Sequence, residues 1–314
     1  MKQLTKIEGL LIKLINIESI SGNESAVARF IETQLTDFKL KRQYIDKSRF
    51  NIVAKKGESN VWLVAHMDTV PPFFKAKVEN GKIFGRGAID NKGNIAGIIS
   101  ASQKLKNINI LFTVGEEKDF IGAKNTTIKD TAIIFEPTKF KIRTSQCGVI
   151  TAKLTAKGDQ KHSSLISKES DNAIHVIAKT LNYLIKQNWN CFNAGVIKGG
   201  IAPNIAAGSA EVDFSVRPRN QIEFARILKA IKTLKGVKVE VINKMPPTKS
   251  LLSKNYPETE PVYFFSELFF FKKGLLFGVG DIANAHTLTE FVNRKDLNIL
   301  PNKILAIVKS LEIN

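Results

Sequence analysis

The sequence is poor in cysteine, in histidine and in long apolar stretches. Its 314 residues include two cysteines and four histidines. Cys147 and Cys191 match no zinc-knuckle or redox spacing, so we expect free thiols in a reducing cytoplasm. No stretch reaches the ~18 apolar residues of a membrane span. The basic N-terminal segment contains Lys13 and Glu18 and lacks a small-residue cleavage site, which predicts an amphipathic helix rather than a signal peptide.

Acidic residues are also scarce relative to basic ones. The chain has 29 acidic and 47 basic residues, a net charge of +18. The lysines are scattered along the whole chain, and no aromatic residues alternate with a basic stripe, which disfavours a nucleic-acid partner. An acidic substrate or an acidic amino-group carrier protein fits this charge better, and an AT-rich genome would produce the same composition. Length and composition otherwise fit a globular protein of two domains of ordinary size or one large domain.

Apolar runs alternate with helical patterns over the first 140 residues. Ser21 precedes Glu24 by three residues, which predicts a capping box opening a helix to about Leu35. A further helix is predicted over 95–105, and buried strands are predicted at 51–54, 61–65, 108–114 and 132–135. This alternation is typical of a layered α/β domain.

The pattern then changes to strand, helix, strand, strand, helix, strand. This is the order of the ferredoxin-like split unit, with elements at 150–155, 171–185, 194–198, 210–216, 222–234 and 237–242. A proline-rich linker follows at 245–248, then a buried helix within 264–271 and a closing amphipathic helix at 302–311. We therefore predict an inserted domain, 142–247, within a larger α/β domain formed by 1–141 and 248–314.

Three predicted strands end in residues that suit metal chemistry. His66 follows the second strand, Glu116 and Glu117 follow the third, and Glu136 follows the fourth. Ligands in open α/β sheets bind beyond the carboxyl ends of the strands, and histidine with carboxylate suits zinc. Each residue alone fits an ordinary loop or a satisfied core position, but together they predict a metal site.

Two further segments carry candidate residues on loops. Residues 85–93 contain three glycines and Asp90. Their spacing matches neither Gly-x-Gly-x-x-Gly nor the P-loop, so a phosphate-binding loop is disfavoured. Without a functional role, the segment would be an ordinary loop before a helix. His286 follows the glycine-rich segment 278–281 and, alone, would be an ordinary surface histidine. His175 lies in a predicted helix with no acidic neighbours, which indicates a structural role.

The motifs HMDTVP, GRGAIDNKG, GEE, FEP and AHTLTE, in this order, resemble those of the zinc aminoacylase and exopeptidase family. That family contains acetylornithine deacetylase, succinyl-diaminopimelate desuccinylase and the glutamate-releasing carboxypeptidases. The resemblance spans nearly the whole chain. It implies a zinc-exopeptidase-like α/β catalytic domain with an inserted ferredoxin-like α+β domain that serves as lid and dimerisation domain.

The resemblance also implies a set of metal ligands. Two zinc ions would be held by five residues: His66, Asp90, Glu117, Glu136 and His286. Cobalt or manganese would suit the same ligands. His66 and Glu136 would hold one ion, Glu117 and His286 the other, and Asp90 would bridge them. Asp68 would orient His66, Glu116 would act as general base, and the peptide bond after Asp90 would be cis.

The inserted domain resembles the family's lid. The His162-Ser163-Ser164 segment implies a histidine that reaches the neighbouring subunit's active site and steadies the oxyanion, and hence a homodimer. Asn204 and Arg217 would bind the substrate's carboxylate. The family often has a proline soon after each of these two segments, where this chain has Leu165-Ile166 and Ala206-Ala207, so the lid geometry stays open.

The resemblance therefore predicts a metal-dependent hydrolase that cleaves the amide bond of an N-acyl amino acid in amino-acid biosynthesis. It would act like an acetylornithine or acetyllysine deacetylase, or like a succinyl-diaminopimelate desuccinylase. A metallo-exopeptidase acting on a dipeptide or a terminal residue shares the same metal site and is the main alternative. A non-catalytic basic binding protein is disfavoured because every ligand and the base are retained. The acyl group, the amine, the native metal and whether the substrate is free or carrier-bound stay open.

Overall fold

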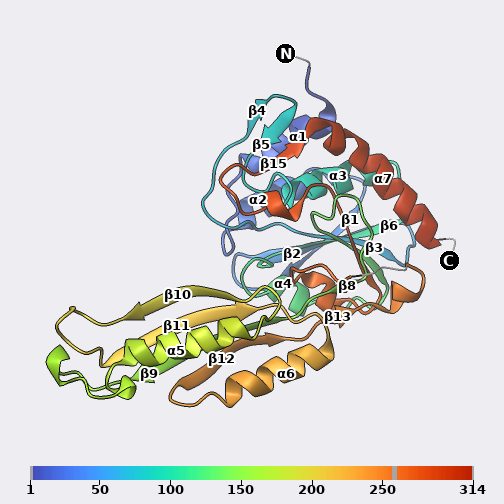
Figure 1. Ribbon diagram of the computed structural model, residues 1–314. Helices are drawn as coiled ribbons and strands as arrows, with labels where there is room; N and C mark the ends of the chain where they lie inside the picture. Colours follow the sequence, from blue (N-terminus) through green and yellow to red (C-terminus); the bar gives the residue numbers. More distant parts are fainter. Residues whose placement is uncertain (1–2, 257–259, 313–314) are drawn as a thin grey trace. The chain divides into compact units, whose positions relative to one another are not determined.

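The computed structural model describes residues 3–256 and 260–312, which divide into two compact units. Of the described residues, the first unit comprises 3–144, 250–256 and 266–312, and the second comprises 145–249 and 260–265. The first is an α/β unit with a mixed sheet, and the second is built on an antiparallel sheet (Figure 1). This architecture confirms the predicted fold class.

A six-stranded mixed sheet forms the centre of the first unit. Its strand order is β1 (Lys39–Tyr44), β2 (Phe50–Lys56), β6 (Ile108–Thr113), β3 (Val61–His66), β7 (Thr131–Phe135) and β14 (Gly274–Phe277). The last four strands are parallel, and β1 and β2 pair antiparallel at one edge. Every residue of β3 and β6 is buried, as their continuous apolar runs predict. The carboxyl ends of the parallel strands therefore meet at one end of the sheet.

Three helices cover one face of this sheet: α1 (Lys6–Ile15), α3 (Lys92–Ser102) and α7 (Arg294–Glu312) (Figure 1). Their apolar side chains share one core with β2, β3 and β6. Helices α3 and α7 pack closely at Gly97, where an added Cβ would lie 2.2 Å from Leu300 Cδ2. The unit also contains α2 (Ser25–Glu32), α4 (Ile121–Lys124) and a small sheet of β15 (Phe291–Asn293), β5 (Lys82–Phe84) and β4 (Lys77–Glu79).

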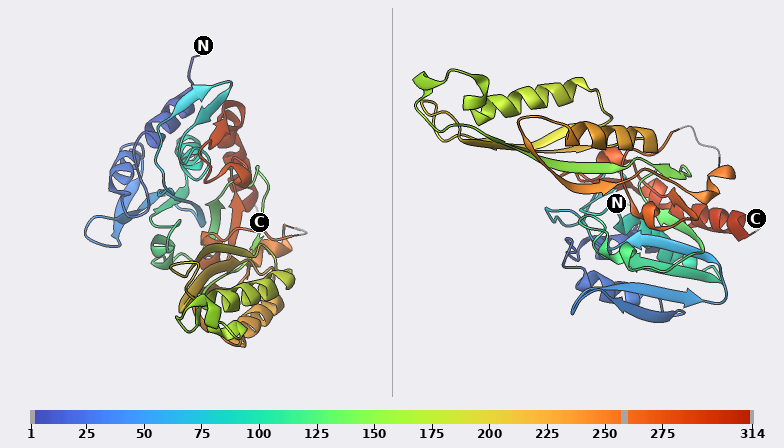
Figure 2. Two further views of the ribbon diagram at one scale, coloured as in Figure 1. Left: turned by 60° about the vertical axis from the view of Figure 1, so that its left-hand side comes forward. Right: turned by 90° about the horizontal axis from the view of Figure 1, so that it is seen from below.

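The second unit has the ferredoxin-like order of elements. Its sheet runs β10 (Asn193–Gly199), β11 (Ser209–Val216), β9 (Val149–Lys157) and β12 (Lys238–Met245), with every neighbouring pair antiparallel. Helices α5 (Ala173–Lys186) and α6 (Gln221–Lys232) lie along one face of this sheet (Figure 2). Leu154 and Val212 of the sheet share a buried core with Ile177 and Ile227 of the helices. A short pair, β8 (Ser145–Gln146) and β13 (Thr248–Lys249), joins the segments that enter and leave this unit.

Three predicted elements differ from the structure. Ser21 caps no helix, because its hydroxyl donates to Asp68 Oδ2 at 2.7 Å, and α2 begins at Ser25 with no side-chain cap. The buried helix expected within 264–271 is only a 3-10 turn, Glu267–Phe270. The closing helix begins eight residues earlier than predicted, because α7 continues through Pro301, a residue that normally breaks helices.

The two cysteines do not form a disulfide bond in the structure. Cys147 is buried, Cys191 is exposed and both are free thiols. Burial raises the pKa of the Cys147 thiol to about 12. Within residues 3–256 and 260–312, no helix is both long enough and apolar enough to cross a membrane.

A buried ion pair joins α1 to α7. Glu8 is 1% exposed, and its carboxylate accepts hydrogen bonds from Arg294 Nε and Nη2, each at 2.8 Å. Asn298 Nδ2 donates to the same carboxylate at 2.7 Å, and the backbone N–H of Thr5 donates at 2.9 Å. The hydrogen bonds from Arg294 are the main cause that lowers the pKa of Glu8 to about 2.

We expect Glu8→Gln to destabilise the fold in a pH-dependent way. Because the folded-state pKa lies below the unfolded one, the carboxylate stabilises the fold above about pH 4.5, and this contribution falls as the pH drops towards 2. The variant should lose about 2 kcal/mol of unfolding free energy at pH 6. Urea unfolding at pH 6 and pH 3 should show a smaller difference between the two proteins at pH 3. A difference that does not change with pH would rule out the carboxylate charge as its cause.

Candidate metal centre

The candidate ligands gather at the carboxyl end of the parallel strands. His66 is the last residue of β3, while Glu116 and Glu117 follow β6 and Glu136 follows β7. Two loop residues join them: Asp90 precedes α3, and His286 lies between β14 and β15. All of these residues belong to the first unit.

Asp90 lies between the two histidines. Its Oδ1 atom is 2.9 Å from His66 Nε2, and its Oδ2 atom is 3.4 Å from His286 Nε2. His286 Nε2 is also 2.9 Å from Glu117 Oε1. One potential ligand atom each from His66, Asp90 and Glu117 lies within 4.8 Å of the others. A carboxylate whose two oxygens face two imidazoles in this way has the geometry of a bridging ligand.

A hydrogen bond links the segment of Asp90 to the segment of Glu136. Glu136 is buried at the end of β7. The Asn91 side-chain amide donates to the carbonyl oxygen of Phe135 at 2.6 Å, which ties the residue after Asp90 to the residue before Glu136. The Asp90–Asn91 peptide bond is cis, which confirms that implication of the resemblance.

Asp68 fixes both His66 and the pair of glutamates. His66 Nδ1 lies 3.0 Å from the Asp68 backbone carbonyl oxygen and 3.5 Å from Asp68 Oδ1, whereas Asp90 faces the other ring nitrogen. The backbone N–H groups of Glu116 and Glu117 each donate to the Asp68 carboxylate at 3.0 Å. Burial would raise the pKa of Asp68, but hydrogen bonds from His66, Ser21 and the backbone more than offset it, so the net pKa is lowered. Asp68 thus stays ionised and holds two strand ends in register.

The cluster carries more negative charge than its buried surroundings favour. Burial raises the pKa of Glu116 and Glu136 well above the ordinary value, and neighbouring carboxylates add to the effect. Burial and the Asp90 charge likewise raise the pKa of Glu117. Hydrogen bonds to Asp90 and Glu117 raise the pKa of His286 to about 10. Imidazole nitrogens and crowded carboxylate oxygens are a donor set that fits divalent cations such as zinc, whose charge would offset this repulsion.

Sequence reasoning missed three buried charged residues beside this centre. Glu267 is 1% exposed, and burial raises its pKa to about 7. Glu267 lies within a phenylalanine-rich run, and this run predicted only a buried apolar segment. Arg86 and Lys92, which flank Asp90 in the sequence, are both fully buried. The Lys92 ammonium donates to the Ile17 carbonyl oxygen at 2.7 Å. The glycine-rich motif that contains both was the only sequence signal for them.

The three residues assigned to the lid lie on the second unit. His162 and Asn204 are neighbours, because the N–H of Ser163 donates to the Asn204 carbonyl oxygen at 3.0 Å. His162 Nδ1 lies 2.8 Å from Ser164 Oγ, and its side chain is exposed. Arg217 follows β11, whereas Asn204 precedes it, so the structure does not bring Arg217 next to the other two. His175 is exposed on α5.

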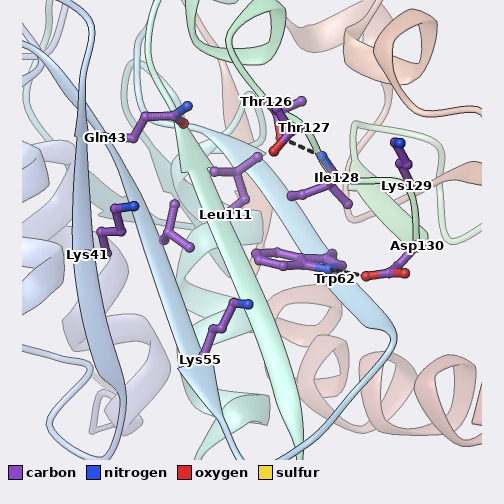
Figure 3. A pocket seen from close by; sticks show the side chains of 11 residues that line it. Lys41, Gln43, Lys55, Trp62, Leu111, Thr126, Thr127, Ile128, Lys129 and Asp130 are labelled. Carbon is purple, nitrogen blue, oxygen red and sulfur yellow. Dashed lines mark hydrogen bonds between the residues drawn. The ribbon is translucent and has the colours of Figure 1, made fainter.

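A hollow of about 470 Å³ lies elsewhere on the first unit and contains none of the candidate ligands (Figure 3). Its floor includes Trp62 and Leu111, and Lys41, Lys55 and Lys129 are among its lining residues. The Trp62 indole N–H donates to Asp130 Oδ2 at 3.3 Å, and the Lys55 ammonium lies 5.4 Å from the centre of the indole ring. The chemistry of the donor groups, rather than the size of a cavity, therefore identifies the candidate site.

Comparisons with known proteins relate the chain to M20 peptidases. A sequence model described as the peptidase dimerisation domain of the M20 group matches residues 144–238. A peptidase M20 domain-containing protein of Schizosaccharomyces pombe is 29% identical over 90% of this chain and 79% of its own. A [LysW]-lysine/[LysW]-ornithine hydrolase of Saccharolobus islandicus is 29% identical over 78% of this chain and 73% of its own.

Solved structures share the fold. A tripeptidase from Staphylococcus aureus superposes with a TM-score of 0.80 at 20% identity, covering 98% of each chain. A dinuclear metal-binding M20 peptidase from Bacillus subtilis gives 0.71 at 13% identity, covering 96% of each chain. Fold, candidate site and relatives together define a metal-dependent hydrolase that acts on amide or peptide bonds. The chain is similar to M20 peptidases over most of its length, which confirms the predicted resemblance.

Proposed function

We propose that this protein hydrolyses the amide bond of an N-acyl amino acid and releases the free amine. The observation that carries the proposal is the Asp90 carboxylate, whose two oxygens face His66 and His286. His66, Asp90, Glu117, Glu136 and His286 would hold two divalent cations, with zinc the first choice and cobalt or manganese suited to the same donors. When bound, such ions polarise an amide carbonyl and lower the pKa of water.

The protein's own residues would orient the groups and move the proton. Asp68 holds the backbone of Glu116, so that this carboxylate is fixed beside the ligands. A Glu116 oxygen would accept the proton of the attacking water and pass it to the leaving amine nitrogen. His162 of a partner chain would donate a hydrogen bond to the developing oxyanion. Asn204 and Arg217 would hold the substrate's carboxylate.

A substrate panel tests the proposal. The zinc- or cobalt-loaded protein should hydrolyse acetylornithine, acetyllysine or succinyl-diaminopimelate, and removal of metal by a chelator should abolish turnover. Turnover of dipeptides or tripeptides alone would establish the exopeptidase alternative, which the tripeptidase fold relative supports. Salt-dependent retention on DNA with no hydrolysis of any amide would favour the basic binding protein instead.

One surface favours a carrier-borne substrate over a free one. The hollow in Figure 3 presents Lys41, Lys55 and Lys129 around an apolar floor, a surface that complements an acidic polypeptide. The net charge of +18 also favours binding of an acidic carrier. The printed name of the S. islandicus relative also describes a substrate linked to LysW. We therefore propose an acidic carrier protein bearing an acylated amino acid as the second candidate substrate.

We expect Lys41→Glu/Lys129→Glu to raise the KM for the carrier-borne substrate about tenfold while leaving that for the free N-acyl amino acid unchanged. The reason is that the carrier alone would reach the hollow. Lys229→Glu/Lys232→Glu, on exposed positions of α6, makes the same change in net charge and is the matched control. Steady-state kinetics at low salt measure the effect. Equal effects of the two double variants would mean that net charge, and not this surface, attracts the carrier.

A further inference from the structure

A single carboxylate outside the candidate ligand set holds the loop that presents Asp90. Glu290 is 0% exposed, and both of its oxygens accept hydrogen bonds from that loop. Oε1 accepts the backbone N–H groups of Ile89 at 3.0 Å and Asp90 at 3.2 Å. Oε2 accepts the backbone N–H of Gly87 at 3.1 Å and the Arg86 guanidinium at 2.8 Å.

The loop depends on this carboxylate for its shape. Gly87 has a φ of +84°, and an added Cβ would lie 2.9 Å from Thr69 Cγ2, so the backbone here adopts a turn that other residues resist. The backbone N–H groups of Gly87, Ile89 and Asp90 converge on one carboxylate and form an anion-binding concavity, which Glu290 fills. Arg86 is itself 0% exposed, so its charge depends on Glu290 for compensation.

The segment that carries Glu290 also carries a candidate ligand. His286 lies four residues earlier, so a short stretch of chain supplies one imidazole and the group that fixes Asp90. The same stretch is paired with the loop's other end, because the Gly85 N–H donates to the Glu290 carbonyl oxygen at 3.0 Å and Phe291 pairs with Phe84. The relative placement of Asp90 and His286 therefore passes through Glu290.

We infer that Glu290 is a positioning residue for the metal centre, which sets the orientation of the Asp90 carboxylate between His66 and His286. The inference rests on the proposed function, since it assigns Asp90 the bridging position. Glu290 touches neither substrate nor metal. It acts through the backbone of residues 87–90, and its loss lets Asp90 turn away from one histidine.

The test is metal affinity in Glu290→Gln, measured by competition with a chromophoric chelator using zinc alone. The amide keeps one acceptor oxygen but turns an N–H₂ towards a backbone N–H or the Arg86 cation, leaving a buried charge uncompensated. We expect zinc affinity to fall by 10- to 100-fold, as is common when the partners that orient ligands are changed. The stabilisation that zinc gives in thermal unfolding should shrink in parallel.

Glu8→Gln is the matched control. Glu8 is also a buried glutamate paired with an arginine, but its partner lies on α7 and none of its hydrogen bonds reaches residues 85–91. This variant should lose stability and keep wild-type zinc affinity. If both variants lose affinity in proportion to their loss of stability, Glu290 has only a structural role and the inference fails.

Two further results separate the possible failures. A wild-type protein that binds no divalent cation would overturn the proposed function. A wild-type protein that binds zinc, with a folded Glu290→Gln that binds it equally well, would overturn the positioning role alone. Should Glu290→Gln not fold, Glu290→Asp keeps the charge and shortens its reach by one methylene. A folded Glu290→Asp with undiminished zinc affinity would again contradict the inference.

Discussion

Glu116→Gln should lower kcat by about a thousandfold or more, because the glutamine cannot accept a proton from water or return one to the amine. Metal affinity should stay close to that of the wild type, since we propose no contact between Glu116 and the ions. The side chain keeps its size, and its backbone N–H keeps its hydrogen bond to Asp68. Steady-state kinetics on the best substrate of the panel, together with metal content per chain, measure both effects.

Glu117→Gln is the natural comparison because the two glutamates are adjacent. Glu117 lies 2.9 Å from His286, and its backbone is held by the same Asp68 carboxylate. As a proposed ligand it should lose metal affinity, and it should regain part of its turnover when metal is added in excess. Similar metal loss in both variants would remove the distinction between base and ligand.

His162→Ala should reduce kcat by about 100- to 1000-fold, the usual effect of removing an oxyanion donor. If His162 serves the partner's site, then mixing this variant with Glu116→Gln should restore activity. Each mixed dimer would have one site that lacks both groups and one site with both intact. After full subunit exchange of equal amounts, half of the dimers are mixed, so we expect about a quarter of wild-type activity.

Subunit exchange itself must be verified, by mass spectrometry of isotopically labelled protein or by energy transfer between labelled subunits. Exchange without recovery of activity would show that His162 acts within its own chain or not at all. We expect the dimer contact at the edge strand β10, where Val196 and Ile197 are exposed. The match of residues 144–238 to a peptidase dimerisation domain supports a homodimer in the same way.

The parts of the fold that depend on local patterns could be predicted from the sequence. Continuous apolar runs identified β3 and β6, and the strand-end rule drew attention to His66 and Glu117. Asp90 and His286 lie on loops, where periodicity says nothing about position, and only the resemblance linked them. Their approach in space depends on contacts between residues almost 200 positions apart.

Two features that local patterns did not reveal involve side chains whose partners are distant in the sequence. Ser21 has the spacing of a helix cap, but its hydroxyl is engaged by Asp68, 47 residues away. Arginine is mostly exposed in proteins, yet Arg86 is fully buried against its partner Glu290, 204 residues away. No local pattern contains this information, because the burial of a charge is decided by which tertiary partner compensates it.

The length of β11 sets a limit on how one substrate can be recognised. Asn204 precedes this eight-residue strand and Arg217 follows it, so roughly 25 Å of extended backbone separates them. An N-acyl amino acid is far shorter than that distance. If both residues hold the substrate's carboxylate side, they must come from different chains, with His162 and its neighbour Asn204 supplied by one and Arg217 by the other. A monomer would then contain every residue type that the reaction needs, but its own Asn204 and Arg217 would lie too far apart to bind one substrate together. Dilution below the dimer dissociation constant would act as an off switch for catalysis.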